Sequence, residues 1–256
     1  MAILEIIELT KKFEGLTAID ACNTEIAQGA IHGLIGPNGA GKTTLFNMIS
    51  GVLQPTSGKL IFKDAEIQGL MPHEVHRYGI ARTFQLVSIF GEMSVLENVM
   101  VGLHARTRAG FLASVLKSRF ARSEEAQVRE EAEGLLAWVM PDLDEQRKQT
   151  SASNLSYGEQ RLLEIARAMA SRPELVLLDE PGAGMNPSEK ARLKDIIYAI
   201  RDMGITVLFV EHDMKLAMAV ADRVTVLDHG VRIAEGPPEE VQANPKVLEA
   251  YLGGDA

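Results

Sequence analysis

One glycine-rich segment constrains the fold of this chain more than any other feature. Residues 36–43 read Gly-Pro-Asn-Gly-Ala-Gly-Lys-Thr, which fits the pattern G-x-x-x-x-G-K-[ST]. An apolar run at 30–35 precedes the segment, and a helical pattern at 42–50 follows it. Glycines between a strand and a helix let backbone N–H groups turn toward one anion, so the pattern predicts a phosphate-binding loop.

Two side chains of this loop are expected to contact a bound nucleotide and its metal ion. Lys42 is expected to reach the β- and γ-phosphates, and the hydroxyl of Thr43 is expected to ligate Mg²⁺. The residues predicted to surround the nucleotide are Gly36, Pro37, Asn38, Gly39, Ala40, Gly41, Lys42, Thr43 and Thr44. The alternative is a glycine-rich turn with a stray lysine, and the flanking strand and helix argue against it.

Strands and helices alternate toward the end of the chain. The predicted strands lie at 3–9, 19–26, 30–35, 59–62, 175–178, 205–210 and 224–227, with a short one ending near 84. Predicted helices at 187–203 and 214–221 separate the last three strands, which favours an α/β fold with a mainly parallel sheet. Residues 92–170 read as helices instead. We expect one domain over 1–256 with a helical subdomain at 88–168.

Composition excludes several classes of protein. A net charge of −9 argues against a nucleic-acid partner held by electrostatics. The longest apolar runs have about six residues, against roughly 20 for a transmembrane helix. Glu5 and Glu8 interrupt the apolar N-terminus, which favours a strand over a signal peptide. Cys22 is the only cysteine, so an intrachain disulfide is excluded and a reducing, cytosolic location is expected.

Two carboxylates follow the predicted strand at 175–178. Asp179 and Glu180 stand at its carboxyl end, the edge where α/β sheets bind ligands. We expect Asp179 to hold Mg²⁺, directly or through water, and Glu180 to orient and deprotonate an attacking water. Acidic residues end many strands without such a role, so this pair alone leaves both interpretations open.

A third motif indicates a family. Leu155-Ser-Tyr-Gly-Glu-Gln160 opens a predicted helix and precedes Asp179. It resembles the signature sequence of the ATP-binding cassette (ABC) ATPases, the motor subunits of ABC transporters. Tyr157 and Glu159 depart from the glycine and glutamine that are usual there. In this family the signature contacts the nucleotide of the opposite subunit, so the resemblance assigns a role in trans to Ser156, Tyr157, Gly158 and Glu159.

The resemblance implies further site residues. Gln85, in Arg82-Thr-Phe-Gln, matches the glutamine that joins Thr43 and Asp179 at the metal. His212 matches the switch histidine at the γ-phosphate and joins Glu180 and Lys42 as a catalytic residue. Phe13 matches the aromatic residue that stacks on adenine; packing in the core is the alternative for Phe13, and a structural histidine is the alternative for His212.

The fold and cofactors that the resemblance implies are specific. We expect a P-loop NTPase of the ABC ATPase type, with a mainly parallel sheet core, an antiparallel β subdomain and a helical subdomain. The expected cofactors are ATP and Mg²⁺. One departure concerns Ala183-Gly-Met-Asn186, because the family commonly has an aspartate at the position of Asn186. An uncharged amide cannot make that aspartate's ion pair across the dimer, although it still forms hydrogen bonds.

Several segments resemble one branch of the family, the ATPase subunits of branched-chain amino-acid importers. They are 182–187, 210–214, the insert at 102–149 and the C-terminal 248–253. The chain resembles the longer of the two ATPase subunits of such importers. The ATPase of the lipopolysaccharide exporter and importers of urea and short amides share much of this pattern, so they remain alternatives. A soluble, non-transport ABC ATPase is a further one.

The resemblance also implies partners and a location. We expect transmembrane permease subunits, a second ATPase subunit in a homo- or heterodimer, and, indirectly, a solute-binding protein. The location implied is the cytoplasmic face of the inner membrane. Basic residues with apolar ones between them, at 104–122, are interpreted either as a membrane-proximal stretch or as a solvated helical face. The transported solute and the direction of transport do not follow from these residues.

Non-transport ABC ATPases fit the motifs less well. A chromosome or DNA-repair ATPase would separate its phosphate loop from its signature by a long coiled coil. Residues 44–154 carry no sustained heptads. A ribosome-associated factor would normally carry two cassettes. A non-catalytic module would be expected to lack Lys42, Glu180 or His212, and all three are present.

Overall fold

The computed structural model describes residues 1–84, 87–104 and 119–252. The chain divides into two compact units. The core unit comprises Met1–Gln85, Glu174–Ala183 and Pro187–Ala256, and the helical unit comprises Leu86–Pro173 and Gly184–Asn186. Gln85 and most of the basic stretch at 104–122 lie outside the described residues, so the structure does not bear on those two expectations.

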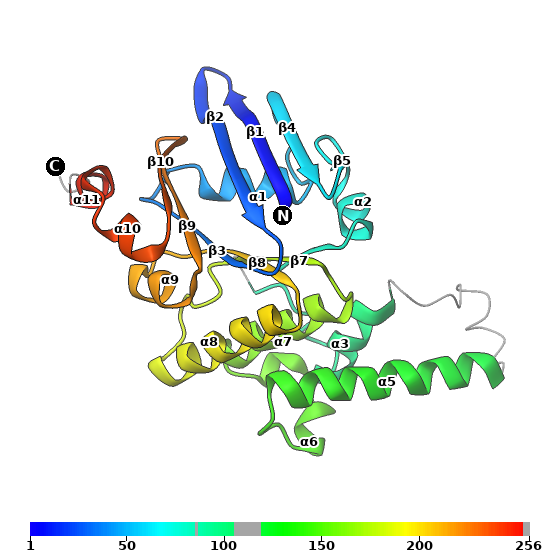
Figure 1. The fold of residues 1–256 in the computed structure, drawn as a ribbon. Coiled ribbons are helices and arrows are strands. Elements are labelled where there is room, and N and C mark those ends of the chain that lie inside the picture. Colours follow the sequence, from blue (N-terminus) through cyan, green and yellow to red (C-terminus); the bar gives the residue numbers. More distant parts are fainter. Residues whose placement is uncertain (85–86, 105–118, 253–256) are drawn as a thin grey trace. The chain divides into compact units, whose positions relative to one another are not determined.

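A six-stranded sheet forms the centre of the core unit, in the order β10-β9-β3-β8-β7-β6 (Figure 1). Its strands are β3 (Ile31–Ile35), β6 (Ile80–Arg82), β7 (Leu175–Asp179), β8 (Thr206–Val210), β9 (Arg223–Asp228) and β10 (Val231–Gly236). All neighbours pair in parallel except β9 and β10, which form an antiparallel hairpin. The predicted fold class, a mainly parallel sheet with an antiparallel part, is confirmed.

The second sheet of the core unit is antiparallel and has the order β2-β1-β4-β5. Its strands are β1 (Ala2–Phe13), β2 (Leu16–Ala27), β4 (Ser57–Phe62) and β5 (Ala65–Glu66). Strand β1 is longer than the apolar run at 3–9 suggested, because it continues beyond its buried residues to the exposed Phe13. Such an extension carries polar residues and leaves no hydrophobic signal in the sequence.

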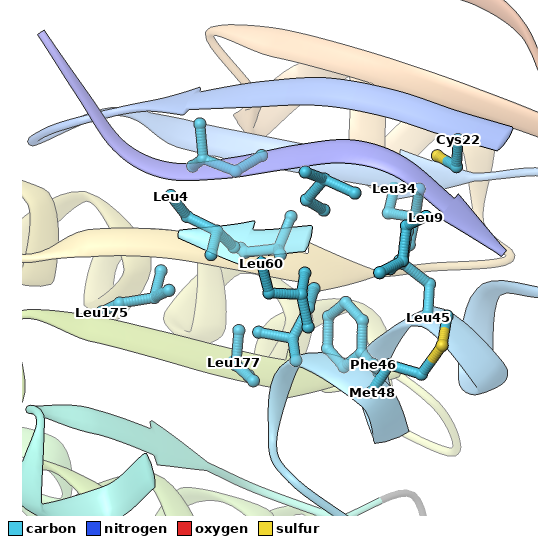
Figure 2. Packing of buried hydrophobic residues seen from close by; sticks show 14 of the residues in the cluster. Leu4, Leu9, Cys22, Leu34, Leu45, Phe46, Met48, Leu60, Leu175 and Leu177 are labelled. Carbon is cyan, nitrogen blue, oxygen red and sulfur yellow. The ribbon is translucent and has the colours of Figure 1, made fainter. Parts of the chain in front are cut away.

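Helix α1 (Lys42–Ile49) packs between the two sheets of the core unit. Phe46 and Met48 of this helix belong to one buried cluster with Leu60 of β4 and Leu177 of β7 (Figure 2). Phe46 has no exposed surface at all. Burial of this apolar face stabilises the helix far more than its short length does, and it fixes the position of the loop that precedes it.

Two helices cover the other face of the parallel sheet. They are α8 (Pro187–Asp202) and α9 (Met214–Val220), which contact β3 and β8. Because both faces are covered, β3, β7 and β8 are buried along their full length, which explains why apolar residues predominate in all three. Three short helices complete the unit: α2 (Pro72–Arg77), α10 (Pro238–Gln242) and α11 (Pro245–Leu252).

The helical unit contains α3 (Val95–His104), α5 (Arg119–Val139), α6 (Glu145–Lys148), a short 3₁₀ turn (Ala152–Asn154) and α7 (Tyr157–Ala170). Helices α3, α5 and α7 pack against one another. Gly102 permits the close approach of α3 to α7, because a Cβ atom there would lie 2.4 Å from the carbonyl oxygen of Arg167. Over the described part of the chain, none of the helices combines the length and the apolar character that crossing a membrane requires.

A buried polar chain joins the two sheets of the core unit. His32 of β3 is 1% exposed, and its Nε2 lies 2.8 Å from the Thr225 hydroxyl of β9. That hydroxyl lies 3.1 Å from the Thr24 hydroxyl of β2, which in turn donates to Glu235 of β10 at 3.0 Å. Burial lowers the pKa of His32 from 6.5 to about 4; Glu235 opposes this shift and Arg223 adds to it.

This lowered pKa predicts an acid-sensitive contribution of His32 to stability. The neutral ring is favoured in the folded state, so the contribution is complete above pH 6.5 and is lost as the pH falls toward 4. A shift of that size corresponds to a loss on the order of 3 kcal/mol in the free energy of unfolding. The expected result is a flatter decline of stability between pH 7 and pH 4.5 for His32→Gln than for the unmodified chain.

Urea unfolding at a series of pH values measures this difference. The control is His73→Gln, which removes an exposed imidazole and should leave the pH profile as it is. Parallel declines in the unmodified chain and in His32→Gln would show that the pKa of His32 is the same in the folded and the unfolded protein.

Candidate nucleotide site

A pocket of about 470 Å³ opens at the carboxyl edge of the parallel sheet. This is where open α/β sheets bind ligands, because the loops that leave adjacent parallel strands diverge there. The residues that line it are Phe13, Leu16, Thr17, Ala18, Asn38, Gly39, Ala40, Gly41, Lys42, Thr43, Thr44, Glu180, His212 and His229. Of the predicted nucleotide residues, Gly36 and Pro37 do not line the pocket; Gly36 is buried and Pro37 is half-buried at the start of the loop.

Glycine is required at two points of the phosphate loop. Gly36 has a φ of +153°, and a Cβ atom there would lie 2.1 Å from the carbonyl oxygen of Leu227 on β9. Gly41 has a φ of +101° and immediately precedes α1; a Cβ there would lie 2.5 Å from the carbonyl oxygen of Ala18. The loop therefore fits between β9 and β2 only with a bare backbone at these positions.

Lys42 folds back over this loop. Its ammonium donates to the carbonyl oxygens of Gly36 at 2.7 Å and Pro37 at 2.8 Å. Burial lowers the pKa of Lys42, and the nearby Glu180 carboxylate opposes that shift. The charge therefore lies inside the pocket at the mouth of the loop, within reach of an anionic ligand.

The first turn of α1 adds further groups that favour an anion. Thr43 and Thr44 both line the pocket, and no acidic residue occupies this turn. The free N–H groups and the positive end of the helix dipole are thus left to a ligand. The arrangement matches the phosphate-binding loop that the spacing predicts.

The two carboxylates after β7 occupy different environments. Asp179 is 1% exposed, and its Oδ2 accepts a hydrogen bond from Arg82 at 2.8 Å. Its Oδ1 is buried and has no hydrogen-bond partner among the residues that the structure describes. A buried carboxylate oxygen without a donor fits a divalent cation, which takes oxygen ligands. Asp179 therefore suits Mg²⁺, and Thr43, which is also an expected ligand, lines the pocket from the first turn of α1.

Glu180, by contrast, faces the pocket. Its backbone has a φ of 49°, an unusual conformation for a residue with a side chain, and its N–H donates to the carbonyl oxygen of Val210 at 3.0 Å. Its Oε1 lies 2.5 Å from Nε2 of His212, which follows β8. Strands β7 and β8 are adjacent, so the fold brings together two residues that the sequence separates by 32 positions.

Several residues that support the site carried no signal that we read from the sequence. Glu211 is 3% exposed and accepts a hydrogen bond from the Gly182 N–H at 2.7 Å, which holds the loop after Glu180. Burial raises the pKa of Glu211, and that hydrogen bond opposes the shift. The turn between β9 and β10 supports the phosphate loop, since the Gly230 N–H donates to the Ala40 carbonyl at 3.0 Å. A His-Gly turn followed by an alternating segment at 231–236 is a hairpin signal.

The signature residues belong to the helical unit, whereas the pocket residues belong to the core unit. Ser156 caps α7, with its Oγ accepting from the Glu159 N–H at 3.2 Å. Glu159 returns the bond by accepting from the Ser156 N–H at 2.8 Å, and it also accepts from Arg147 at 2.8 Å. Burial opposes ionisation here, yet these hydrogen bonds together lower the pKa of Glu159. The Ser156 hydroxyl hydrogen remains available as a donor.

Tyr157 and Gly158 differ in their exposure. Tyr157 is 45% exposed, its hydroxyl accepts from Arg161 at 3.0 Å, and the guanidinium lies 5.4 Å from its ring centre. A Cβ at Gly184 would lie 2.8 Å from this ring, so the bulky tyrosine fits because its neighbour is glycine. Gly158 is buried in the first turn of α7.

Comparison with known proteins decides the family. The profile of the ABC transporter family matches residues 19–183, and that of the branched-chain amino acid ATP-binding cassette transporter matches 231–256. The chain belongs to the ABC transporter family. As an ABC ATPase it is a nucleotide-binding subunit, which confirms the resemblance inferred from the signature.

Individual relatives match nearly the whole chain. The high-affinity branched-chain amino acid transport ATP-binding protein BraF of Pseudomonas aeruginosa is 44% identical over 98% of both chains. LivG of Escherichia coli, described in the same words, is 41% identical over 98% of both. Among solved structures, the ADP conformation of MJ1267, an ATP-binding cassette of an ABC transporter, is 32% identical, covers 99% of both chains and has a TM-score of 0.83.

Phe13 provides a test of how this ABC ATPase holds its nucleotide. The ring is 43% exposed and lines the pocket, so it is not a core residue. We expect Phe13→Ala to weaken ATP binding by roughly 1–3 kcal/mol, the range for losing one base–aromatic stack. Equilibrium titration with a fluorescent ATP analogue measures the change.

The matched control is Leu16→Ala, because Leu16 pairs with Phe13 across β1 and β2 and lines the same pocket without an aromatic ring. Its affinity should change much less. Equal losses in both variants would mean that general apolar contact, not stacking, holds the base.

Proposed function

We propose that this protein is the ATP-hydrolysing motor subunit of an importer of branched-chain amino acids. The observation that carries the proposal is the Glu180–His212 pair, with 2.5 Å between Oε1 and Nε2, in the same pocket as the phosphate loop. A carboxylate held by an imidazole beside a phosphate site suits general-base attack of water on a γ-phosphate. The names of BraF and LivG support the choice of solute.

Each group in the pocket has one task under this proposal. Phe13 stacks on adenine, and the loop from Gly36 to Thr44 with Lys42 binds the phosphates. Glu180 accepts the proton of the attacking water, while His212 orients Glu180 and contacts the γ-phosphate. Thr43, Asp179 and Gln85 would hold Mg²⁺, which when bound neutralises charge on the β- and γ-phosphates.

Completion of the site by a second ATPase subunit is the next part of the proposal. The exposed Ser156 at the start of α7, supported by Tyr157, Gly158 and Glu159, is suited to bind a phosphate because a hydroxyl and a helix N-terminus lie together. The neighbouring subunit's nucleotide is the proposed ligand. Closure on ATP and reopening after hydrolysis would then drive permease subunits docked at the helical subdomain of 88–168, on the cytoplasmic face of the membrane. A solute-binding protein would deliver the amino acid to these permease subunits.

Glu180→Gln tests the proposed hydrolysis. The amide keeps the shape of the side chain but accepts no proton, so we expect ATP binding to persist and turnover to fall by about 10²–10⁴-fold. An ATP-bound dimer should accumulate because closure is retained while reopening is blocked. Phosphate release and size-exclusion chromatography with ATP measure the two effects.

Glu174→Gln is the matched control, since Glu174 binds Lys63 at the opposite end of β7 and does not line the pocket. Near-normal turnover in Glu180→Gln would exclude Glu180 as the base.

A transport assay tests the proposed solute. Membrane vesicles that carry the transporter with the unmodified subunit should accumulate leucine, isoleucine and valine. ATP hydrolysis without such uptake would contradict the assignment of the solute.

A mixed dimer tests the action in trans. Lys42→Ala and Ser156→Arg should each be inactive alone, because both sites of each homodimer lack one half. In a mixed dimer both substitutions fall in the same nucleotide site. The other site therefore combines an intact Lys42 with an intact Ser156. With random pairing and independent sites, about a quarter of the unmodified activity should return.

Where the native partner is a different ATPase chain, one chain carries the substitution in the phosphate loop and the other carries the substitution in the signature. Absence of any recovery in both formats, with dimers confirmed by chromatography, would show that Ser156 does not complete the neighbouring site.

A further inference from the structure

Arg82 occupies an unusual position for a charged residue. It ends β6, the edge strand of the parallel sheet, and its side chain is only 8% exposed. The guanidinium lies between two aromatic rings, 5.7 Å from the centre of Phe46 and 5.3 Å from that of Phe84. Burying this charge costs free energy unless it is paired, so its hydrogen-bond partners indicate what it does.

Those partners connect two parts of the site. Nη1 of Arg82 donates to Asn47 Oδ1 at 2.8 Å and to Ser50 Oγ at 2.6 Å, at the end of the helix that begins with Lys42. Nη2 donates to Asp179 Oδ2 at 2.8 Å. One planar guanidinium thereby fixes the position of Asp179 relative to α1, and a lysine cannot reproduce this fork.

The pair also sets the charge at the metal position. Arg82 and Asp179 together are neutral, and the Asp179 side chain is only 1% exposed. Without the guanidinium, a buried carboxylate would stand alone and attract any cation. With it, Oδ2 is engaged and Oδ1 is the oxygen without a partner among the described residues.

We propose that Arg82 is a positioning residue that makes metal binding at Asp179 depend on the nucleotide. Resting on the magnesium role given to Asp179 in the proposed function, Arg82 engages Oδ2 of Asp179 and leaves Oδ1 for the metal. The neutral pair holds a free divalent cation only weakly. The phosphates supply the missing negative charge, so the cation enters with ATP and not before it.

Binding of Mn²⁺ followed by electron paramagnetic resonance, with no nucleotide present, tests this role. Arg82→Gln removes the charge, so we expect free Mn²⁺ to bind at least about tenfold more tightly than to the unmodified chain. Arg82→Lys keeps a charge but loses the fork and should give a smaller increase. This increase in the affinity for free Mn²⁺ should vanish when Arg82→Gln is combined with Asp179→Asn.

Ser50→Ala is the matched control, because it removes one bond of Arg82 to α1 and leaves the Arg82–Asp179 pair in place. A purely structural Arg82 would change stability without changing the affinity for free Mn²⁺, and that result would overturn the proposal. If Arg82→Gln does not fold, the Arg82→Lys variant serves as the test. An affinity of this variant for free Mn²⁺ equal to that of the unmodified chain would overturn the proposal.

The proposed function has a separate readout. Asp179→Asn should weaken the binding of Mn²⁺ in the presence of ATP. If it does so while Arg82→Gln leaves the free Mn²⁺ affinity unchanged, only the role of Arg82 is wrong. If Asp179→Asn has no effect with ATP, Asp179 is not a metal ligand, and both assignments are wrong.

Discussion

Burial of α1 between the two sheets of the core unit is the interaction on which the site depends. Phe46 and Met48 share a buried cluster with leucines of β4 and β7 (Figure 2). A helix of eight residues has little stability alone, so this packing holds its first turn in place. The phosphate loop is fixed at one end by β3 and at the other by α1. Its backbone N–H groups are therefore organised before any ligand arrives.

A buried ion pair occurs in each of the two units. Arg82 binds Asp179 in the core unit, and Arg161 lies 3.3 Å from Glu164 in the helical unit. Burial raises the pKa of Glu164, and a hydrogen bond from the Ser88 N–H opposes that shift. Pairs of this kind contribute little net stability compared with apolar packing. The Arg82–Asp179 pair joins β6 to β7, whereas Arg161 and Glu164 both belong to α7, and the hydrogen bond from Ser88 to Glu164 ties this helix to another segment. Asp179 and helix α7 are thereby each tied to a neighbouring segment.

The strand order explains how one edge of the parallel sheet gathers the phosphate loop, Glu180 and His212. Strands β3, β8 and β7 are neighbours, although β8 is the latest of them in the chain. Their carboxyl ends carry the phosphate loop, His212 and the Asp179–Glu180 pair. Since neighbouring strands lie about 4.8 Å apart, side chains from successive strand ends meet without long loops. The positive φ of Glu180 turns its carboxylate into the pocket, while Asp179 stays buried below it.

The sequence by itself determined the features that depend on local chemistry. The glycines and Lys42 specify a phosphate loop because a strand, a bare backbone and a helix follow one another directly. The mainly apolar sequences of β3, β7 and β8 specify buried parallel strands, since both faces of such strands must be covered. Ser156 and Glu159 likewise form a capping box that is readable from their spacing.

Only the tertiary structure decided which distant residues meet. Arg82 and Asp179 are 97 positions apart, and nothing near Arg82 in the sequence indicates a buried partner. The contact exists because β6 pairs with β7, and strand order is not encoded by the periodicity of either strand. For the same reason, the hydrogen bond from Gly230 of the β9–β10 turn to the phosphate loop could not be predicted from the sequence. Local patterns fix what a segment can bind, whereas the packing of segments fixes which charges face each other.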